Sequence, residues 1–168
     1  MLDDIVEYAR LEHGVRVLRL RPVPLDAVLA DLELQLQPRF QEAGLHYARA
    51  ASGLSVLGDP ERLRQALQHL LLNALAFTPA GGEVRVDLRR EGDRVLLRVS
   101  DTGVGIEADQ RQHIFEPFVQ RTMPGARRSG AGLGLALARR LARLMDGELT
   151  ADGVPGRGSV FTLSLRAA

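Results

Sequence analysis

The sequence predicts an α+β fold, a two-layer α/β sandwich in which helices cover one face of a mixed, largely antiparallel sheet. Apolar residues recur at helical spacing in four long segments. Two neighbouring segments instead alternate apolar and polar residues around a short turn, as a β-hairpin does. The helical and alternating segments follow one another in mixed order, which is typical of α+β proteins. With 168 residues, the chain is long enough for one domain with its own core.

Three helices are predicted in the first half of the chain. The third of them begins at Asp59-Pro60, because an aspartate can accept hydrogen bonds from the free amides of a first turn and proline suits the first helical position. The expected elements are, in order, a helix over 2–11, a strand over 15–25, a helix over 25–43, short strands near 45–50 and 54–57, and a helix over 59–77.

A hairpin is the clearest feature of the second half. Apolar and polar residues alternate on both sides of the turn at Gly92. The expected elements are hairpin strands over 83–90 and 94–100, a short helix near 107–114, an irregular stretch over 116–131, a helix over 133–145, and strands near 148–151 and 159–165.

Composition excludes several classes of protein. The net charge is +1, and only five Phe, two Tyr and no Trp are present to stack on bases, so nucleic-acid binding is not expected. The chain has no cysteine, which excludes disulfides and thiolate metal sites. No apolar run is long enough to span a membrane, and Asp3 and Asp4 stand where a secretory signal would carry bases. We therefore expect this part of the protein to be cytoplasmic.

A polar stripe on the third helix is the first candidate site. His69, Asn73 and Ala76 share one side of this helix, apart from the apolar stripe that would form the core. The carboxamide oxygen of Asn73 is a hard, neutral ligand that suits a magnesium ion otherwise held by water and phosphate oxygens. Taken alone, Asn73 is better explained as a surface amide.

Two glycine-rich segments are candidates for nucleotide contacts. Asp101-Thr102-Gly103-Val104-Gly105-Ile106 follows the hairpin, where a carboxylate could accept a hydrogen bond from the amine of adenine and the glycines let the backbone approach a flat group. The segment 130–135 opens the last long helix, so its free amides and the helix dipole favour a phosphate. Each segment taken alone could be an ordinary turn or loop.

The order of these motifs resembles that of a known family. Asn73, DTGVGI, FEPF, GAGLGLAL and GRGS follow one another as do the N, G1, F, G2 and G3 boxes of the histidine kinase catalytic domain, which has the Bergerat ATP-binding fold shared with DNA gyrase. The likeness runs from about 25 to 165. The head of the chain, EYARLEHG, resembles the end of the second dimerisation helix of such kinases. The resemblance implies a helix remnant over 1–14 and an ATP-binding domain over 15–168.

The resemblance also assigns roles to residues. It implies that Asn73 binds Mg²⁺, that Asp101 holds the adenine amine of ATP, and that Ser159 lies near the base through water. The residues expected to shape the adenine pocket are Gly103, Gly105, Ile106 and Ile114, and those expected to offer amides to the phosphates are Gly132, Leu133 and Gly134.

The chain departs from the family pattern at two positions. Ala76 stands where many members have Lys, and Gln120 stands in the predicted lid, over 119–129, where a cation is common. Such cations offset charge on the transferring phosphoryl group. Arg127 is the expected substitute, with Arg121 and Arg128 as alternatives. His69 occupies a position where the related ATPases carry a general-base Glu, so a catalytic or polarising role is predicted for it.

Three functions stay open at this point. The leading interpretation is a two-component sensor histidine kinase that transfers the γ-phosphoryl group of Mg-ATP to a histidine on a dimerisation domain. The alternatives are a nucleotide-binding regulatory module with weakened transfer and an anti-sigma-type serine kinase. The first interpretation implies three partnerships: the phosphoacceptor domain of the same protein, a second copy in a homodimer, and a response regulator. It also allows a parent protein anchored in a membrane.

Overall fold

The computed structural model describes residues 2–14, 17–120 and 132–168. Its main sheet has five strands in the order β2-β4-β5-β7-β6. Only β2 and β4 are parallel, and the other three pairs are antiparallel, so the predicted mixed, largely antiparallel sheet is confirmed. The strands are β2 His46–Arg49, β4 Glu83–Glu91, β5 Arg94–Asp101, β6 Glu148–Val154 and β7 Gly158–Arg166.

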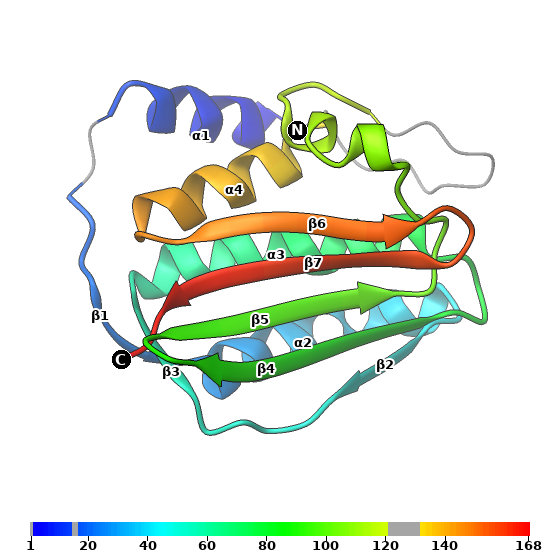
Figure 1. Cartoon of the computed structure of the whole chain (residues 1–168), viewed down its shortest axis with the longest axis horizontal. Helices are drawn as coiled ribbons and strands as arrows, with labels where there is room; N and C mark the ends of the chain where they lie inside the picture. The colour runs from blue at the N-terminus through cyan, green and yellow to red at the C-terminus, as the bar shows by residue number, and fades with distance from the viewer. Residues whose placement is uncertain (1, 15–16, 121–131) are drawn as a thin grey trace.

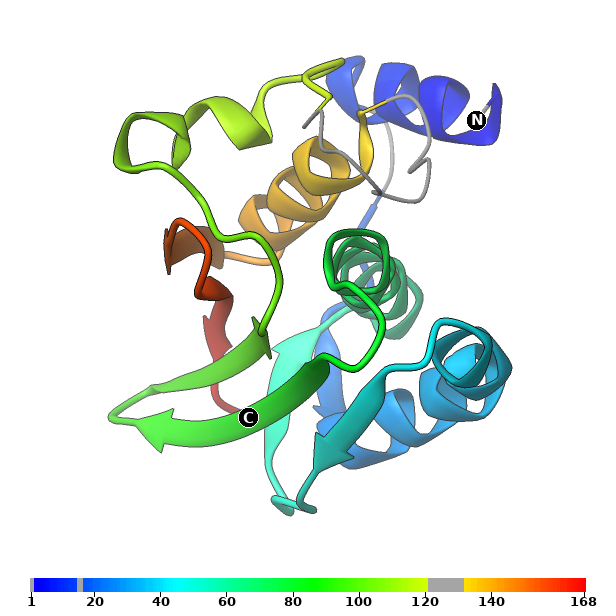
Figure 2. The ribbon, with the colours of Figure 1, turned by 90° about the vertical axis from the view of Figure 1, so that its right-hand side faces the viewer.

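Three helices pack on one face of this sheet and form the second layer (Figures 1 and 2). They are α2 Leu25–Glu42, α3 Pro60–Phe77 and α4 Gly134–Leu144. The core lies between the layers, where Leu29, Leu67, Val84 and Phe161 are each fully buried. The strand face turned away from the helices carries most of the polar residues of β4, as expected for an antiparallel sheet with one wet face.

The first helix, α1 Leu2–Glu12, lies against α4 on the far side from the sheet (Figure 1). Glu7 of α1 forms an ion pair with Arg62 at the start of α3, and the Arg62 side chain is almost fully buried there. Arg140 of α4 donates a hydrogen bond to the carbonyl of Leu11. None of the described helices is both long and apolar enough to cross a membrane.

The strand predicted over 15–25 was too long. Only Arg21–Pro24 forms a strand, β1, which pairs antiparallel with β3 Ser55–Gly58 in a separate two-stranded sheet. Pro22 and Pro24 lack the amide hydrogen that a central strand needs, so the segment suits only such a short pairing. Residues 17–20 have no regular structure, and Leu25 already belongs to α2.

The short helix predicted near 107–114 was also wrong. Two separate 3₁₀ turns, Ala108–Gln110 and His113–Phe115, take its place. Neither has a side-chain N-cap, and the second buries Ile114 and Phe115 in the core. Pieces this short are typical of 3₁₀ turns, which tighten a connection without extending into a helix.

The start of α3 is confirmed as predicted. The Asp59 Oδ1 atom accepts hydrogen bonds from the amides of Glu61 at 3.1 Å and Arg62 at 3.2 Å, and Pro60 is the first helical residue. Loss of such a cap typically costs about 1 kcal/mol of stability. This start fixes the rotation of α3, and therefore which of its residues face α4 and which face the sheet.

Candidate nucleotide-binding site

The Asp101 carboxylate is buried at the end of β5. Its Oδ1 atom accepts hydrogen bonds from the amide of Gly103 at 2.9 Å and from the amide of Ser159 at 3.3 Å. Its Oδ2 atom accepts a hydrogen bond from the Ser159 hydroxyl at 2.9 Å. Only 6% of Asp101 is exposed. A buried carboxylate held by several donors keeps a fixed direction, as an acceptor for an exocyclic amine requires.

Ser159 therefore contacts Asp101 directly. The two residues are cross-strand partners of β5 and β7, and Ser159 is 2% exposed. The sequence predicted Ser159 near the base through water. The structure shows that its hydroxyl donates to the Asp101 carboxylate and holds its orientation, and the contact with the base through water stays a prediction.

The predicted glycines lie where the chain passes close to other backbone atoms. A Cβ atom on Gly103 would be 2.2 Å from the carbonyl oxygen of Phe77, and one on Gly105 would be 2.0 Å from that of Val154. Gly105 also has a φ of +79°, which side chains rarely adopt. Both glycines are therefore required by packing, and they bring the segment after Asp101 onto the end of α3 and the β6–β7 turn.

Two apolar residues predicted to line the adenine pocket are buried in the structure. Ile106 and Ile114 are 3% and 4% exposed, and both belong to the main core cluster. The β6–β7 turn covers this region, because Gly153 lies against the amide of Ile106. Arg111 was not predicted from the sequence. It donates to the carbonyl of Gly153 at 3.0 Å and pairs with Asp152 at 2.9 Å, which fastens the turn in place.

His69 and Asn73 lie on the side of α3 that faces α4. The Nδ1 atom of His69 would be 3.3 Å from a Cβ atom on Gly134, the first residue of α4. Burial lowers the pKa of His69 and outweighs the opposite effect of Asp4 on α1, so the ring is neutral at pH 7. A neutral imidazole can accept a proton or a hydrogen bond.

Asn73 is buried with an unmatched polar atom. It is 8% exposed, and its Nδ2 atom has no hydrogen-bond partner among the described residues. A buried amide without a partner is costly, and a carboxamide can turn over to present its oxygen at the same place. The side chain thus fits a ligand such as Mg²⁺. The described residues contain no cluster of three His, Cys, Asp or Glu side chains that could hold a metal.

The N-terminus of α4 faces the same space. Its N-cap residue, Leu133, makes no side-chain hydrogen bond to the first turn, and the first turn carries no acidic residue. Among the described residues, no side chain caps this 11-residue helix, whose first-turn amides and dipole favour an anion. Gly134 lies next to His69, whereas Gly132 lies against the backbone of Phe118 and Val119. That Gly132, Leu133 and Gly134 offer amides to phosphates stays a prediction.

Helix α3 connects the two ends of the site. Gly134 lies at His69, and Gly103 lies at Phe77. These two α3 residues are eight positions apart, which is about 12 Å along a helix. Asn73 lies midway between them. The segment after Asp101 and the α4 N-terminus thus lie at two points of α3 that are about 12 Å apart along the helix, with Asn73 between them.

Of the predicted lid, over 119–129, the structure describes only Val119 and Gln120, together with the flanking residues Phe118 and Gly132. The amide of Phe118 donates to the carbonyl of Gly132 at 3.1 Å, so the two ends of the segment are held together. Phe118 is 61% exposed and has a φ of +64°. The residues predicted to supply cations, Arg121, Arg127 and Arg128, lie outside the described residues. Ala76 is half-buried on α3, one turn beyond Asn73.

Residues 58–168 match the family described as histidine kinase-, DNA gyrase B- and HSP90-like ATPases. The chain belongs to this family. Its relatives include the alginate biosynthesis sensor protein KinB of Pseudomonas aeruginosa, which is 36% identical over 98% of this chain and 28% of KinB. The sensor-like histidine kinase SenX3 of Mycobacterium tuberculosis is 32% identical over 99% of this chain and 41% of SenX3. The chain thus spans less than half the length of these relatives and corresponds to their ATPase domain.

Solved structures agree with this assignment. The structure of full-length ShkA in complex with AMPPNP has a TM-score of 0.86 and 36% identity, over 99% of this chain and 35% of ShkA. The complex of the histidine kinase ThkA with the response regulator protein TrrA has a TM-score of 0.78 at 20% identity, so it supports the fold alone.

Proposed function

We propose that this chain binds Mg-ATP and is the catalytic domain of a two-component sensor histidine kinase. The observation that carries the proposal is the buried Asp101 carboxylate, held by Gly103 and Ser159 at one end of α3 while the free α4 N-terminus lies at the other. Two comparisons support this proposal: the relative KinB is named a sensor protein, and the similar structure of ShkA is a complex with AMPPNP.

Each residue has a task in this proposal. Asp101 accepts from the adenine amine, Ile106 and Ile114 enclose the ring, and the amides of Leu133 and Gly134 bind phosphate oxygens. Asn73 holds Mg²⁺, which when bound neutralises charge on the β- and γ-phosphates. Neutral His69, beside the α4 N-terminus, can accept a hydrogen bond from an N–H of the attacking histidine.

We further propose that the phosphoryl acceptor is a histidine on a dimerisation domain of the same protein, and that α1 is the end of its second helix. Homodimerisation and a response regulator as the onward acceptor follow from that proposal. The ion pair between Glu7 and Arg62 supports it, since it fastens α1 to the helix that carries Asn73.

Nucleotide binding is tested by calorimetry with ADP and Mg²⁺. Asp101→Asn should weaken ADP binding about tenfold or more, because a hydrogen bond to a charged acceptor contributes roughly 1.5–3 kcal/mol. Asp87→Asn is the matched control, since Asp87 is exposed on β4, away from the helices. Equal loss in both variants, or none in Asp101→Asn, would remove Asp101 from the site.

Phosphoryl transfer needs a separate experiment with γ-labelled ATP. The chain alone should not label itself, whereas an added dimerisation domain of the parent protein should become labelled on histidine. Label that appears on serine of an added protein would favour the anti-sigma-type kinase. ADP binding without any transfer would favour the regulatory module, which Ala76 in place of Lys makes the second candidate.

A further inference from the structure

A cavity of about 700 Å³ lies between α2 and the edge strand β2, away from the nucleotide site. This volume is within the range of small-molecule pockets, roughly 300–1,000 Å³. Its apolar floor is formed by Leu36, Phe40, Leu45 and Leu71, all of them buried in the core. Polar side chains of α2 and β2 surround the floor.

The cavity is separate from the proposed ATP site. Leu71 is the α3 residue that reaches it, and Leu71 and Asn73 are two positions apart, about 200° around the helix. The two sites therefore lie on opposite sides of α3. None of the residues assigned to nucleotide binding lines the cavity.

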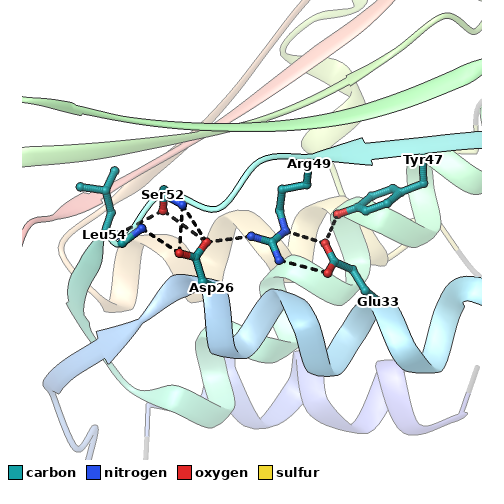
Figure 3. Close-up of polar contacts among 7 residues, drawn as sticks. Asp26, Glu33, Tyr47, Arg49, Ser52 and Leu54 are labelled. Carbon is teal, nitrogen blue, oxygen red and sulfur yellow. Dashed lines mark hydrogen bonds and ion pairs between the residues drawn. The ribbon is translucent and has the colours of Figure 1, made fainter.

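A network of charged residues ties α2 to β2 beside the floor (Figure 3). Arg49 donates to Glu33 Oε1 at 2.6 Å, to Glu33 Oε2 at 3.1 Å and to Asp26 Oδ1 at 2.7 Å. Tyr47 donates to Glu33 Oε1 at 2.7 Å. Burial resists ionisation of Glu33, but the bonds from Arg49 and Tyr47 outweigh it and lower the pKa of this carboxyl.

The two charged residues of the network that line the cavity, Glu33 and Arg49, balance each other. Asp26 lies outside the lining, where it also accepts hydrogen bonds from the amides of Ser52 and Gly53. Each of the two lining residues thus already has an oppositely charged partner at hydrogen-bond distance. An ionic ligand would bring a charge into a partly dry site with no counter-charge left for it, which is costly. The wall therefore favours an uncharged ligand.

The rim supplies flat and polar contacts. The rings of Phe40 and Tyr47 are 5.4 Å apart and tilted by 49°, so a third ring can pack beside them. Gln37 and Gln41 line the same rim one helical turn apart, and both are exposed. Their carboxamides can each donate and accept a hydrogen bond.

We propose that the cavity between α2 and β2 is a second ligand site, which binds an uncharged, flat and largely apolar molecule with hydrogen-bonding groups along one edge. The apolar floor receives the body of the ligand. Gln37 and Gln41 bind its polar edge. Because Leu71 belongs to α3, the ligand touches the helix that also carries Asn73.

The test uses the ¹⁵N-labelled chain and three probes with one ring system: 2-naphthamide, 2-naphthoate and 2-naphthamidine. The neutral amide should shift the backbone amide of Tyr47 and the side-chain amides of Gln37 and Gln41. It should bind at least tenfold more tightly than either ion. Equal binding of the three probes would overturn the proposal, as would shifts confined to Asp101 and Ser159.

Two variants locate the binding. Gln37→Trp places a large side chain over the cavity from an exposed helix position, so it should weaken 2-naphthamide binding at least tenfold without lowering the unfolding midpoint. Gln35→Trp makes the same change on α2 outside the cavity and should bind as the wild type does. Unchanged binding in Gln37→Trp, or equal loss in both, would overturn the proposal.

Discussion

At the scale of single residues, the proposed site combines buried polar side chains with Ala76, an apolar residue where many family members have a lysine. Asp101 and Ser159 fix each other across two strands, and Asn73 has a buried polar atom without a partner among the described residues. Ala76 is different, because it offers no polar group at a position one turn from Asn73. In the proposed enzyme, this position looks toward the phosphates.

We expect Ala76→Lys to tighten ATP binding more than ADP binding. A cation at this position would reach a phosphate oxygen, and a charge-assisted hydrogen bond contributes on the order of 1.5–3 kcal/mol. That is about tenfold or more in ATP affinity by calorimetry. Arg127→Ala and Arg128→Ala are the companion variants. If a lid arginine already supplies the charge, its replacement should weaken ATP binding. The lysine at position 76 should then add less to ATP affinity. No change in any of the three would contradict the placement of the phosphates.

At the scale of elements, α2 and β2 are joined mainly by the network of Asp26, Glu33, Tyr47 and Arg49. Asp26 also accepts from the amides of Ser52 and Gly53 in the connection after β2, and these bonds lower its pKa. The hydrogen bonds that Arg49 donates to Glu33 raise the pKa of Arg49. The side chain of Arg49 is 11% exposed, whereas its partners are 26–29% exposed.

Arg49→Leu should therefore destabilise the chain by roughly 2–4 kcal/mol, because it leaves two partly buried carboxylates without their counter-charge. The free energy of unfolding in urea measures this. Arg64→Leu is the matched control, since its pair with Asp31 is largely exposed and should change stability by less than about 1 kcal/mol. An equal change in the free energy of unfolding in both variants would show that the network stabilises the chain no more than an exposed ion pair does.

The elements also show what the sequence could predict. The start of α3 was predictable because Asp59-Pro60 acts on the adjacent turn, and Asp101 and its glycines form one continuous motif. The pairing of β1 with β3 and the Arg49 network were not, because each joins segments far apart in the chain. The role of Arg111 likewise depends on where the β6–β7 turn lies, and no local pattern indicates that.

At the scale of the whole molecule, the proposed nucleotide site and the cavity beside α2 share one helix, α3. The core between sheet and helices holds α3 in place, and α3 carries Asn73 toward α4 and Leu71 toward the cavity beside α2. The fold was predictable because this core follows from repeated apolar patterns. The pH dependence of the stability rests instead on single side chains, which titrate in two separate pH ranges.

In the upper pH range, His69 governs the change in stability. Its pKa in the folded chain is below the ordinary value of 6.5, so above that pH the ring is neutral in both states and has no effect on stability. As the pH falls through 6.5, the unfolded chain takes up the proton first, and the folded state loses stability until its own lower pKa is reached. The loss is at most about 1.4 kcal/mol per pH unit.

The lower range is set by carboxylates such as Glu33, whose pKa is below the ordinary 4.5 in the folded chain. Their contribution is complete above 4.5 and is lost as the pH falls through the folded value. We therefore expect the free energy of unfolding of the nucleotide-free chain to fall as the pH drops below 6.5 and again below 4.5. His69→Asn should remove the first fall and keep the second. His46→Asn, which replaces an exposed histidine on β2, is the control and should keep both falls in stability. If the fall below pH 6.5 persists in His69→Asn, burial of the His69 ring does not govern stability near neutral pH.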